Sequence, residues 1–349
     1  MIKDKSIFIK NIYYMLSYAF KELNQGVYEN VEKEDFENIH NLFAAILSKG
    51  IGKQLKQGLY REYVSINEDR SSLRGKIDMP GTVKLQVSQK RYLSCEYDEL
   101  SENNLLNQIL KMTALLLIKS NEVKSEYRDD LKKEMLYFST VEVIEPYGIQ
   151  WSGIRFHRNN NSYRMLISIC QLIVEGMLMS TTSGDYKLAS FIDDQRMCRL
   201  YEKFILEYYA KEWPRLNASA PEIPWALDDG LGTMLPVMQS DIVLQYKNQV
   251  LVIDAKYYGQ IMQQQFDVET VRSNNLYQIF TYVKNLSIKQ QDKIVSGMLL
   301  YAKTEKGIQP DYSYQMSGNT ISVMTLDLNT EFKDISAQLD NVASSFLCI

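Results

Sequence analysis

Two short apolar segments joined by only two residues constrain the fold of this chain more than any other feature. The segments DIVLQY (241–246) and QVLVIDAKYY (249–258) are typical of buried strands, and only Lys247 and Asn248 lie between them. Two-residue loops join antiparallel strands in tight hairpins, and Asn tolerates the positive φ that such loops need. The sequence therefore predicts a buried antiparallel hairpin.

The register of this hairpin brings charged side chains together at one end. With a two-residue loop, Tyr246 faces Gln249, and counting outward, Asp241 faces Asp254. Side chains alternate between the two faces of a strand, so Lys256 shares a face with both aspartates. Directly opposed side chains have Cβ atoms about 5 Å apart. Two carboxylates and one amine are thus expected to converge at the end of a mostly apolar element.

This combination of groups indicates a particular chemistry. Two facing carboxylates in a medium of low dielectric constant repel each other, and one takes up a proton unless a cation lies between them. Oxygen ligands favour Mg²⁺ or Mn²⁺ over zinc, and Mg²⁺ commonly binds through one or two carboxylates plus waters and substrate phosphates. Lys256 could position or polarise the attacking water, or stabilise charge on the phosphate. The pattern indicates metal-dependent phosphodiester hydrolysis, with Asp241 and Asp254 as metal ligands.

Composition disfavours other kinds of catalysis. The chain has only two histidines, His40 and His157, and neither lies near a serine or cysteine nucleophile motif. The four cysteines are widely separated and form no CxxC pair. A zinc site, a disulfide framework and a catalytic triad are therefore disfavoured. Catalysis is left to carboxylates, lysines and tyrosines.

Charge and hydropathy limit the partners of the chain. A formal net charge of −4 provides no global basic field that would draw the chain onto nucleic acid. Delivery by a partner should matter more than intrinsic affinity for DNA. No run approaches the roughly 18 apolar residues of a membrane span, and the apolar segment in MIKDKSIFIKN (1–11) is too short for a signal peptide. We expect a cytoplasmic protein without a membrane contact.

The first part of the chain combines helical and alternating patterns. Apolar residues at helical spacing predict helices at 11–23, 35–59 and about 102–138. The alternating stretches between 61 and 101, which include LRGKIDMPGTVKL (73–85), are broken by glycine and proline and predict a small antiparallel β element. A Gly, Asn and Ser-rich segment then marks a boundary. We predict a mixed helical and antiparallel-β N-terminal domain over 1–160.

The second part, 161–349, has the pattern of an α/β domain. Two amphipathic helices precede the hairpin, and a helix, a buried strand and a late strand follow it. The expected positions of these elements are 165–178, 196–213, 274–286, 296–302 and 321–328.

The arrangement of Asp241, a hairpin and Asp254-Ala255-Lys256 resembles the core of PD-(D/E)xK restriction-endonuclease-like nucleases. Resemblance to the RecB-like branch implies two further elements of the site. One is an acid on a preceding helix, for which Glu202 is the counterpart and which would assist metal binding. The other is a Q-x-x-x-Y helix, matched by Gln278 and Tyr282, which share one helix face. Ser240 stands where the motif has its proline.

Segments spread over most of the chain resemble the McrC family, the nuclease subunits of McrBC restriction systems. The resemblance implies a Mg²⁺-dependent endonuclease that acts on double-stranded DNA containing modified cytosine, together with a McrB-like AAA+ GTPase hexamer. The partner would bind GTP, since no G-x-x-x-x-G-K-[ST] is present here, and the first half would engage it. The segments are 11–20, 73–78, 95–107, 191–204, 252–258 and 275–278.

Simpler interpretations of the same residues stay open. Asp254 and Lys256 could form a solvated strand end with a weak ion pair, and Glu202 could lie on the wet face of its helix. Gln278 and Tyr282 could lie at a helix surface and at the rim of the core. The alternative functions are a non-catalytic GTPase activator with a nuclease-like scaffold, and a free-standing RecB-like repair nuclease.

Overall fold

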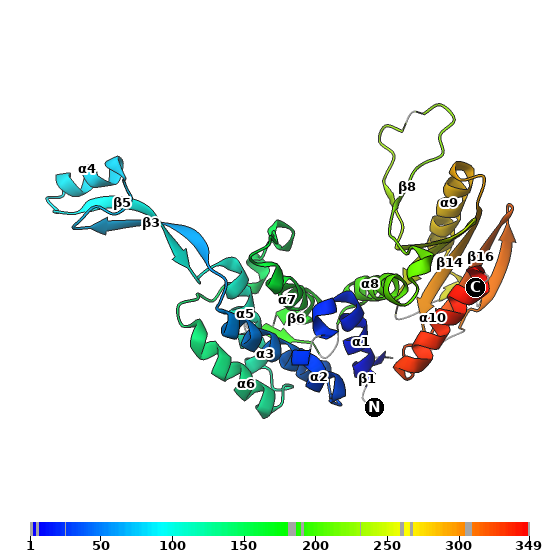
Figure 1. Cartoon of the computed structure of the whole chain (residues 1–349), viewed down its shortest axis with the longest axis horizontal. Coiled ribbons are helices and arrows are strands. Elements are labelled where there is room, and N and C mark those ends of the chain that lie inside the picture. The colour runs from blue at the N-terminus through cyan, green and yellow to red at the C-terminus, as the bar shows by residue number, and fades with distance from the viewer. Residues whose placement is uncertain are drawn as a thin grey trace. The chain divides into compact units, whose positions relative to one another are not determined.

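The chain forms two compact units in a computed structural model (Figure 1). Unit 1 comprises Met1–Leu42, Glu175–Leu178 and Ala189–Ile349, and unit 2 comprises Phe43–Val174 and Met179–Leu188. The structure describes residues 3–4, 7–24, 26–180, 186–189, 192–230, 232–258, 262–265, 268–303 and 309–347.

A five-stranded mixed sheet forms the centre of unit 1. Its strand order is β10-β11-β14-β16-β15. The β10–β11 and β15–β16 pairs are antiparallel, whereas β11–β14 and β14–β16 are parallel. The parallel step from β11 to β14 needs a crossover connection, which α9 supplies. The strands are β10 (Ile242–Tyr246), β11 (Gln249–Lys256), β14 (Ile294–Ala302), β15 (Tyr312–Met316) and β16 (Asn319–Leu326).

Helices bury both faces of this sheet. On one face, Val243 and Val252 form a cluster with Ile279 and Val283 of α9 (Ser273–Lys289). The alternate hairpin positions, Ile242, Leu244, Leu251 and Ile253, are also fully buried, and α8 (Asp194–Glu212) and α10 (Phe332–Leu347) contact β11. The near-continuous apolar runs of β11 and β14 follow from burial on two sides. The α/β class, the strands and α9 are confirmed.

The N-terminal segment of the chain belongs to unit 1. Helix α1 (Ile9–Ala19) packs against α8, where the Tyr18 ring lies 5.6 Å from that of Phe204 and the Tyr18 hydroxyl donates to Glu212 Oε1 at 2.9 Å. The Asn11 amide also donates to two carbonyls that follow β16. The division into units therefore differs from the predicted boundary after residue 160, because the apolar face of α1 is buried against the C-terminal part.

Other short elements of unit 1 lie outside the central sheet. They are β1 (Lys3–Asp4), β2 (Ile7–Phe8), α2 (Glu29–Lys33), β8 (Glu222–Ile223), β9 (Met238–Gln239), β12 (Met262–Gln265) and β13 (Val268–Val271), with 3-10 turns at Lys21–Asn24, Gly26–Tyr28 and Pro214–Leu216.

Unit 2 combines helices with a three-stranded antiparallel sheet. The sheet order is β3-β5-β4, and β3 (Glu62–Arg70) pairs with β5 (Leu93–Ser101) along its whole length. In Figure 1 this sheet extends away from the helices of the same unit. The predicted antiparallel β element is confirmed. The helices are α5 (Leu105–Lys119), α6 (Ser125–Met135) and most of α3 (Ile39–Gln57) and α7 (Arg164–Met177), since the first turn of α3 and the end of α7 are counted in unit 1. The shorter elements are β6 (Leu178–Ser180), β7 (Tyr186–Leu188) and 3-10 turns at Leu136–Phe138, Pro146–Gly148, Trp151–Gly153 and Asn161–Tyr163.

One stretch predicted as β structure is largely a helix. Within 73–85 the structure has only the short β4 (Lys76–Ile77), and α4 (Met79–Val87) follows it. Asp78 is the N-cap and accepts a hydrogen bond from Gly81 N at 3.1 Å. Pro80 lies in the first turn, where its missing N–H leaves no hydrogen bond unmade. The proline and glycine therefore mark a helix start instead of a break in a strand.

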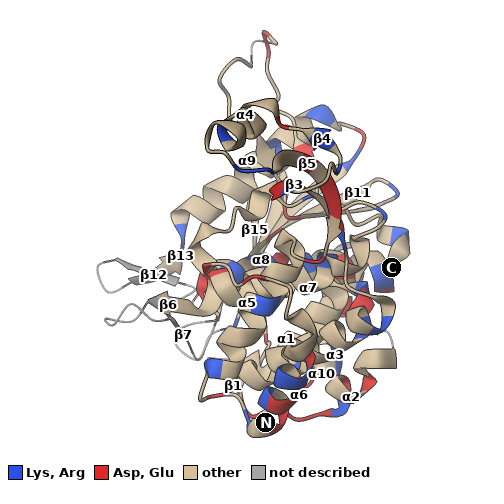
Figure 2. Ribbon diagram, turned by 90° about the vertical axis from the view of Figure 1, so that its left-hand side faces the viewer, with Lys and Arg blue, Asp and Glu red and all other residues tan. Residues whose placement is uncertain are grey.

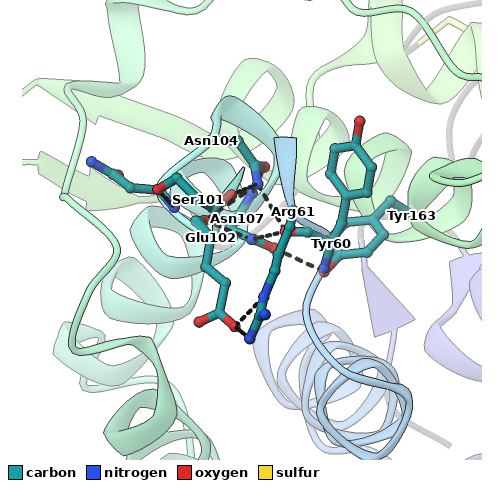
Figure 3. A network of polar contacts seen from close by, with 8 residues as sticks. Tyr60, Arg61, Ser101, Glu102, Asn104, Asn107 and Tyr163 are labelled. Carbon is teal, nitrogen blue, oxygen red and sulfur yellow. Dashed lines mark hydrogen bonds and ion pairs between the residues drawn. The ribbon is translucent and has the colours of Figure 1, made fainter. Parts of the chain in front are cut away.

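A network of hydrogen bonds holds the base of the three-stranded sheet to the helices of unit 2 (Figure 3). Asn104 and Asn107, at the start of α5, both donate to the carbonyl of Tyr60 at 2.9 Å. Asn107 also donates to the carbonyl of Glu102 at 2.7 Å and accepts from the Tyr163 hydroxyl at 2.8 Å. We refer to these contacts as the Asn107 network.

Charge and hydropathy in the structure agree with the composition. In the view of Figure 2, Lys and Arg are interspersed with Asp and Glu along the described chain. None of the helices within the described ranges is long and apolar enough to cross a bilayer.

Candidate active site at the end of the central hairpin

The hairpin has the register that its loop length predicts. Tyr246 pairs with Gln249, and Ile242 pairs with Ile253. Asp241 directly precedes Ile242 and Asp254 directly follows Ile253, so the two aspartates stand on either side of the end of the hairpin, as the predicted register requires. In the loop it is Lys247 that adopts a positive φ, of +52°, whereas Asn248 does not. The prediction that Asn248 takes the positive φ is therefore wrong by one residue, and this does not change the register.

Asp241, Asp254 and Lys256 meet where the hairpin ends. Lys256 Nζ lies 2.9 Å from Asp254 Oδ2 and 3.9 Å from Asp241 Oδ2. Asp241 Oδ2 also accepts a hydrogen bond from the backbone N–H of Ala255 at 3.0 Å. The exposed fractions of the three side chains are 18%, 1% and 12%. A solvated strand end with a weak ion pair does not fit this degree of burial.

The Asp254 carboxylate has fewer partners than a buried anion needs. Both of its oxygens are buried, and neither accepts a hydrogen bond from the described residues. The Lys256 ammonium, whose Nζ lies 2.9 Å from Oδ2, is the one cation that pairs with this carboxylate among the described residues. A buried acceptor without a hydrogen bond costs about 1–3 kcal/mol, and more if it is charged. This position is unfavourable for the fold unless another group binds there.

The pKa values of the cluster reflect competition between burial and charge. Burial raises the pKa of Asp254 to about 7, against the opposing effect of the Lys256 cation, and the Asp241 charge raises it further. Burial also raises the pKa of Asp241. For Lys256, burial alone acts to lower the pKa, but the two carboxylates hold it above its usual range. One ammonium thus balances part of the charge of two carboxylates.

A hard divalent cation fits the donors that the hairpin presents. Asp241 and Asp254 offer only oxygen ligands, and the Asp254 carboxylate, which pairs with Lys256 alone, has lone pairs left for a ligand. Mg²⁺ needs only one or two carboxylates besides waters and substrate oxygens. Asp241 and Asp254 are therefore the residues that could hold such an ion.

Glu202 lies near this pair without joining it in a three-residue metal cluster. Its Oε1 accepts a hydrogen bond from Cys198 Sγ at 3.1 Å. Burial raises the pKa of Glu202, and the Asp241 charge adds to the effect. Within the described ranges, no three acidic, histidine or cysteine side chains are placed to hold one ion together. The role of Glu202 as a direct metal ligand stays a prediction.

Gln278 and Tyr282 contact each other and the segment that leads to Asp241. Gln278 Nε2 donates to the Tyr282 hydroxyl at 2.9 Å, and that hydroxyl donates to the carbonyl of Gln239 at 3.0 Å. Gln239 lies two residues before Asp241. The pair therefore fixes the strand that leads to the first aspartate, and no described hydrogen bond joins the pair to either carboxylate.

Sequence patterns did not reveal three residues around Lys256. Tyr301 of β14 is the sheet partner of Lys256 of β11, and Tyr258 follows Lys256 by two residues. Asn275 forms a hydrogen bond with each tyrosine. The parallel register between β11 and β14 brings them together, and no local motif encodes that register. By contrast, Cys198 lies four residues before Glu202, so helical spacing could have indicated their contact.

Comparisons with known proteins agree with one another. The model of a family described as McrBC 5-methylcytosine restriction system component matches residues 4–302. The chain is 26% identical over 344 residues to the type IV methyl-directed restriction enzyme EcoKMcrBC of Escherichia coli (strain K12), and the match covers 97% of this chain and 98% of that relative.

The fold resembles a chain in a solved complex. That complex is the refined half-complex from a tetradecameric assembly of Thermococcus gammatolerans McrB AAA+ hexamers with bound McrC. The TM-score is 0.51 at 19% identity, and the match covers 96% of this chain and 76% of the other. At this identity the likeness concerns the fold alone.

Proposed function

Because the chain belongs to the McrBC family of restriction system components, we propose that it is the DNA-cutting subunit of a GTP-dependent, type IV system directed at modified cytosine. The buried group of Asp241, Asp254 and Lys256 carries this proposal. The Asp254 carboxylate is buried with the Lys256 ion pair as its one described polar contact, which costs stability, and a bound catalytic metal ion would supply a further partner. The fold assignment that accompanies the proposal is a PD-(D/E)xK nuclease domain.

In this proposal Asp241 and Asp254 hold Mg²⁺, or Mn²⁺, at the end of the hairpin. The bound ion supplies Lewis-acid stabilisation of the phosphate. Lys256 has a raised pKa, so its ammonium stays protonated and cannot take a proton from water. It acts as a fixed cation that orients the water and stabilises negative charge on the scissile phosphate. Glu202 supports the site from α8, and it lies near enough to Asp241 that the Asp241 charge adds to the rise of the Glu202 pKa.

The proposal includes a partner that binds GTP. The solved relative contains McrB AAA+ hexamers with bound McrC, and we transfer this assembly to the present chain. A McrB-like GTPase hexamer would recognise the modified DNA and bind GTP, and the chain would stimulate it and cut. We assign the contact with the hexamer to the predicted N-terminal part, residues 1–160, of which residues 43–160 belong to unit 2 whereas the proposed nuclease residues belong to unit 1.

The decisive experiment combines the full chain with a McrB-type GTPase, GTP, Mg²⁺ and DNA containing 5-methylcytosine. The Asp254→Ala variant should stimulate GTP hydrolysis normally but cut nothing. Asp327→Ala is the matched control, because Asp327 also pairs with a lysine where strands end, at 2.7 Å from Lys303, but is more exposed. Its cutting should equal that of the wild type.

The possible results separate the alternatives. Cutting by Asp254→Ala at a rate near that of the wild type would refute the proposed site. Stimulation of the GTPase without any cutting by the wild-type chain would favour a non-catalytic activator. Efficient cutting without the partner would favour a free-standing nuclease.

A further inference from the structure

A buried asparagine at the start of α9 joins two tyrosines near Lys256. Asn275 is 6% exposed, its Nδ2 donates to the Tyr301 hydroxyl at 2.9 Å, and its Oδ1 accepts from the Tyr258 hydroxyl at 3.4 Å. The asparagine amide can serve both hydroxyls at once because it carries a donor and an acceptor. One side chain thus fixes the hydroxyl ends of both tyrosines.

The backbone ties both tyrosines to Lys256. Tyr301 is its partner in the parallel β11–β14 ladder, and paired residues in a sheet project to the same face. Tyr258 follows Lys256 by two residues, and its ring centroid lies 6.3 Å from that of Tyr301. Tyr301 is fully buried, and Tyr258 packs against the same apolar cluster. A fully buried ring on the neighbouring strand and a partly buried ring two residues along the chain therefore flank Lys256.

We propose that Asn275 is a positioning residue for Lys256, acting through Tyr301 and Tyr258. The inference rests on the nuclease function proposed above. Lysine has a flexible four-carbon stem, so its ammonium has a fixed position only where neighbouring groups confine the stem. Locking the two tyrosines confines that stem. It keeps Lys256 Nζ at its position 2.9 Å from Asp254 Oδ2 and 3.9 Å from Asp241 Oδ2.

Helix α9 thereby acts on the site through two separate links. The Gln278 and Tyr282 pair holds the segment before Asp241. Asn275, one turn earlier on the same helix, holds the residues around Lys256. The first link concerns a proposed metal ligand, and the second concerns the fixed cation. Loss of the second link should therefore reduce the cutting rate without reducing metal affinity.

The test uses the full chain in its complex with the GTPase, with GTP, Mg²⁺ and modified DNA. Asn275→Leu removes both hydrogen bonds at similar side-chain size, and Tyr301→Phe removes only the hydroxyl that accepts from Asn275. Asn274→Leu is the matched control, because Asn274 is the exposed neighbour on the same helical turn. Single-turnover cutting rate, KM for DNA, Ca²⁺ affinity by calorimetry and thermal unfolding are measured for each variant.

Asn275→Leu and Tyr301→Phe should each cut about 10- to 100-fold more slowly, the usual effect of removing a supporting partner in an active site. KM, Ca²⁺ affinity and GTP turnover should stay at wild-type values, as should every property of Asn274→Leu. The double variant should be no slower than the slower single variant, because both substitutions break one link. Tyr301→Phe keeps the test decisive if Asn275→Leu does not fold.

Three results would overturn the inference. The first is a cutting rate within about twofold of wild type for Tyr301→Phe and for any folded Asn275→Leu. The second is a loss of cutting rate in the double variant that equals the product of the losses in the single variants. The third is a loss of Ca²⁺ affinity that accompanies the loss of cutting rate. If Asp254→Ala also cuts normally, the proposed function fails together with the inference. If Asp254→Ala is inactive while the Asn275 and Tyr301 variants cut normally, only the positioning role fails.

Discussion

Two buried polar clusters in this chain differ in how their atoms are partnered. In the Asn107 network of unit 2, each buried side-chain nitrogen or oxygen has a hydrogen-bond partner (Figure 3). At the end of the hairpin in unit 1, both oxygens of Asp254 lack one. Satisfied networks make a structure specific and rigid, whereas unsatisfied charges weaken it. The first cluster therefore maintains the fold, and the second fits a site kept for its chemistry.

Asp254→Asn should have the largest expected effect, a loss of cutting without a loss of stability. Loss of one of two metal-binding carboxylates should reduce cutting by about three factors of ten or more, since metal assistance is worth several kcal/mol. Stability without metal should stay the same or rise, because a buried charge is removed. Cutting assays and denaturant unfolding measure the two effects. A marked loss of stability would mean that Asp254 supports the fold.

Lys256→Ala should separate the role of the lysine from that of the two carboxylates. Turnover should fall by about 10²- to 10³-fold, the range for removal of one charge-stabilising group. Ca²⁺ binding should persist or strengthen, because a like charge has been removed. Calorimetric titration with Ca²⁺ measures the affinity, and complete loss of binding would contradict the separate roles of lysine and carboxylates.

Asn107→Leu should have the opposite pattern. The substitution removes the acceptor of the buried Tyr163 hydroxyl and one donor each from the half-buried carbonyls of Tyr60 and Glu102, to which Asn104 still donates. At about 1–3 kcal/mol for each unsatisfied group, unfolding should become easier by a few kcal/mol. Cutting per folded molecule should be unchanged, and the exposed Asn121→Leu should leave both properties intact. If Asn107→Leu unfolds at the same denaturant concentration as the wild type, the Asn107 network does not maintain the fold.

The dependence of stability on pH should also differ between wild type and Asp254→Asn. The Asp254 pKa is raised from 3.8 to about 7 on folding, so in the metal-free protein the folded state binds the proton more tightly than the unfolded state. Its stabilising contribution is complete below about pH 4 and is lost as the pH rises toward 7, by on the order of 1.4 kcal/mol per pH unit. Asp254→Asn should lack this component. Matched unfolding curves between pH 4 and 8 test it, and identical slopes would show that the carboxylate is not protonated on folding.

Local sequence patterns predicted much of this site, and packing determined the rest. A two-residue loop fixes a hairpin register, so the opposition of Asp241 and Asp254 followed from counting. The contact of Gln278 with Tyr282 followed from helical spacing. The pairing of Tyr301 with Lys256 depends on the parallel register of β11 and β14, and the contact of Asn275 with Tyr301 depends on the packing of α9 on β14, neither of which a local sequence pattern fixes. Pro80 and Gly81 are typical of strand breaks, so the pattern does not predict the start of α4, for which Asp78 is the N-cap.

The packing of α1 against α8 has a consequence for how the protein is made. Tyr18 and Glu212 contact each other across 194 residues of sequence. At a synthesis rate of about 5–20 residues per second, α1 leaves the ribosome roughly 10–40 s before the helix that covers it. Most of unit 2 is continuous in sequence and can fold during that interval, whereas the apolar side of α1 stays uncovered. Until α8 has been synthesised, the apolar side of α1 is therefore a segment through which the nascent chain can aggregate.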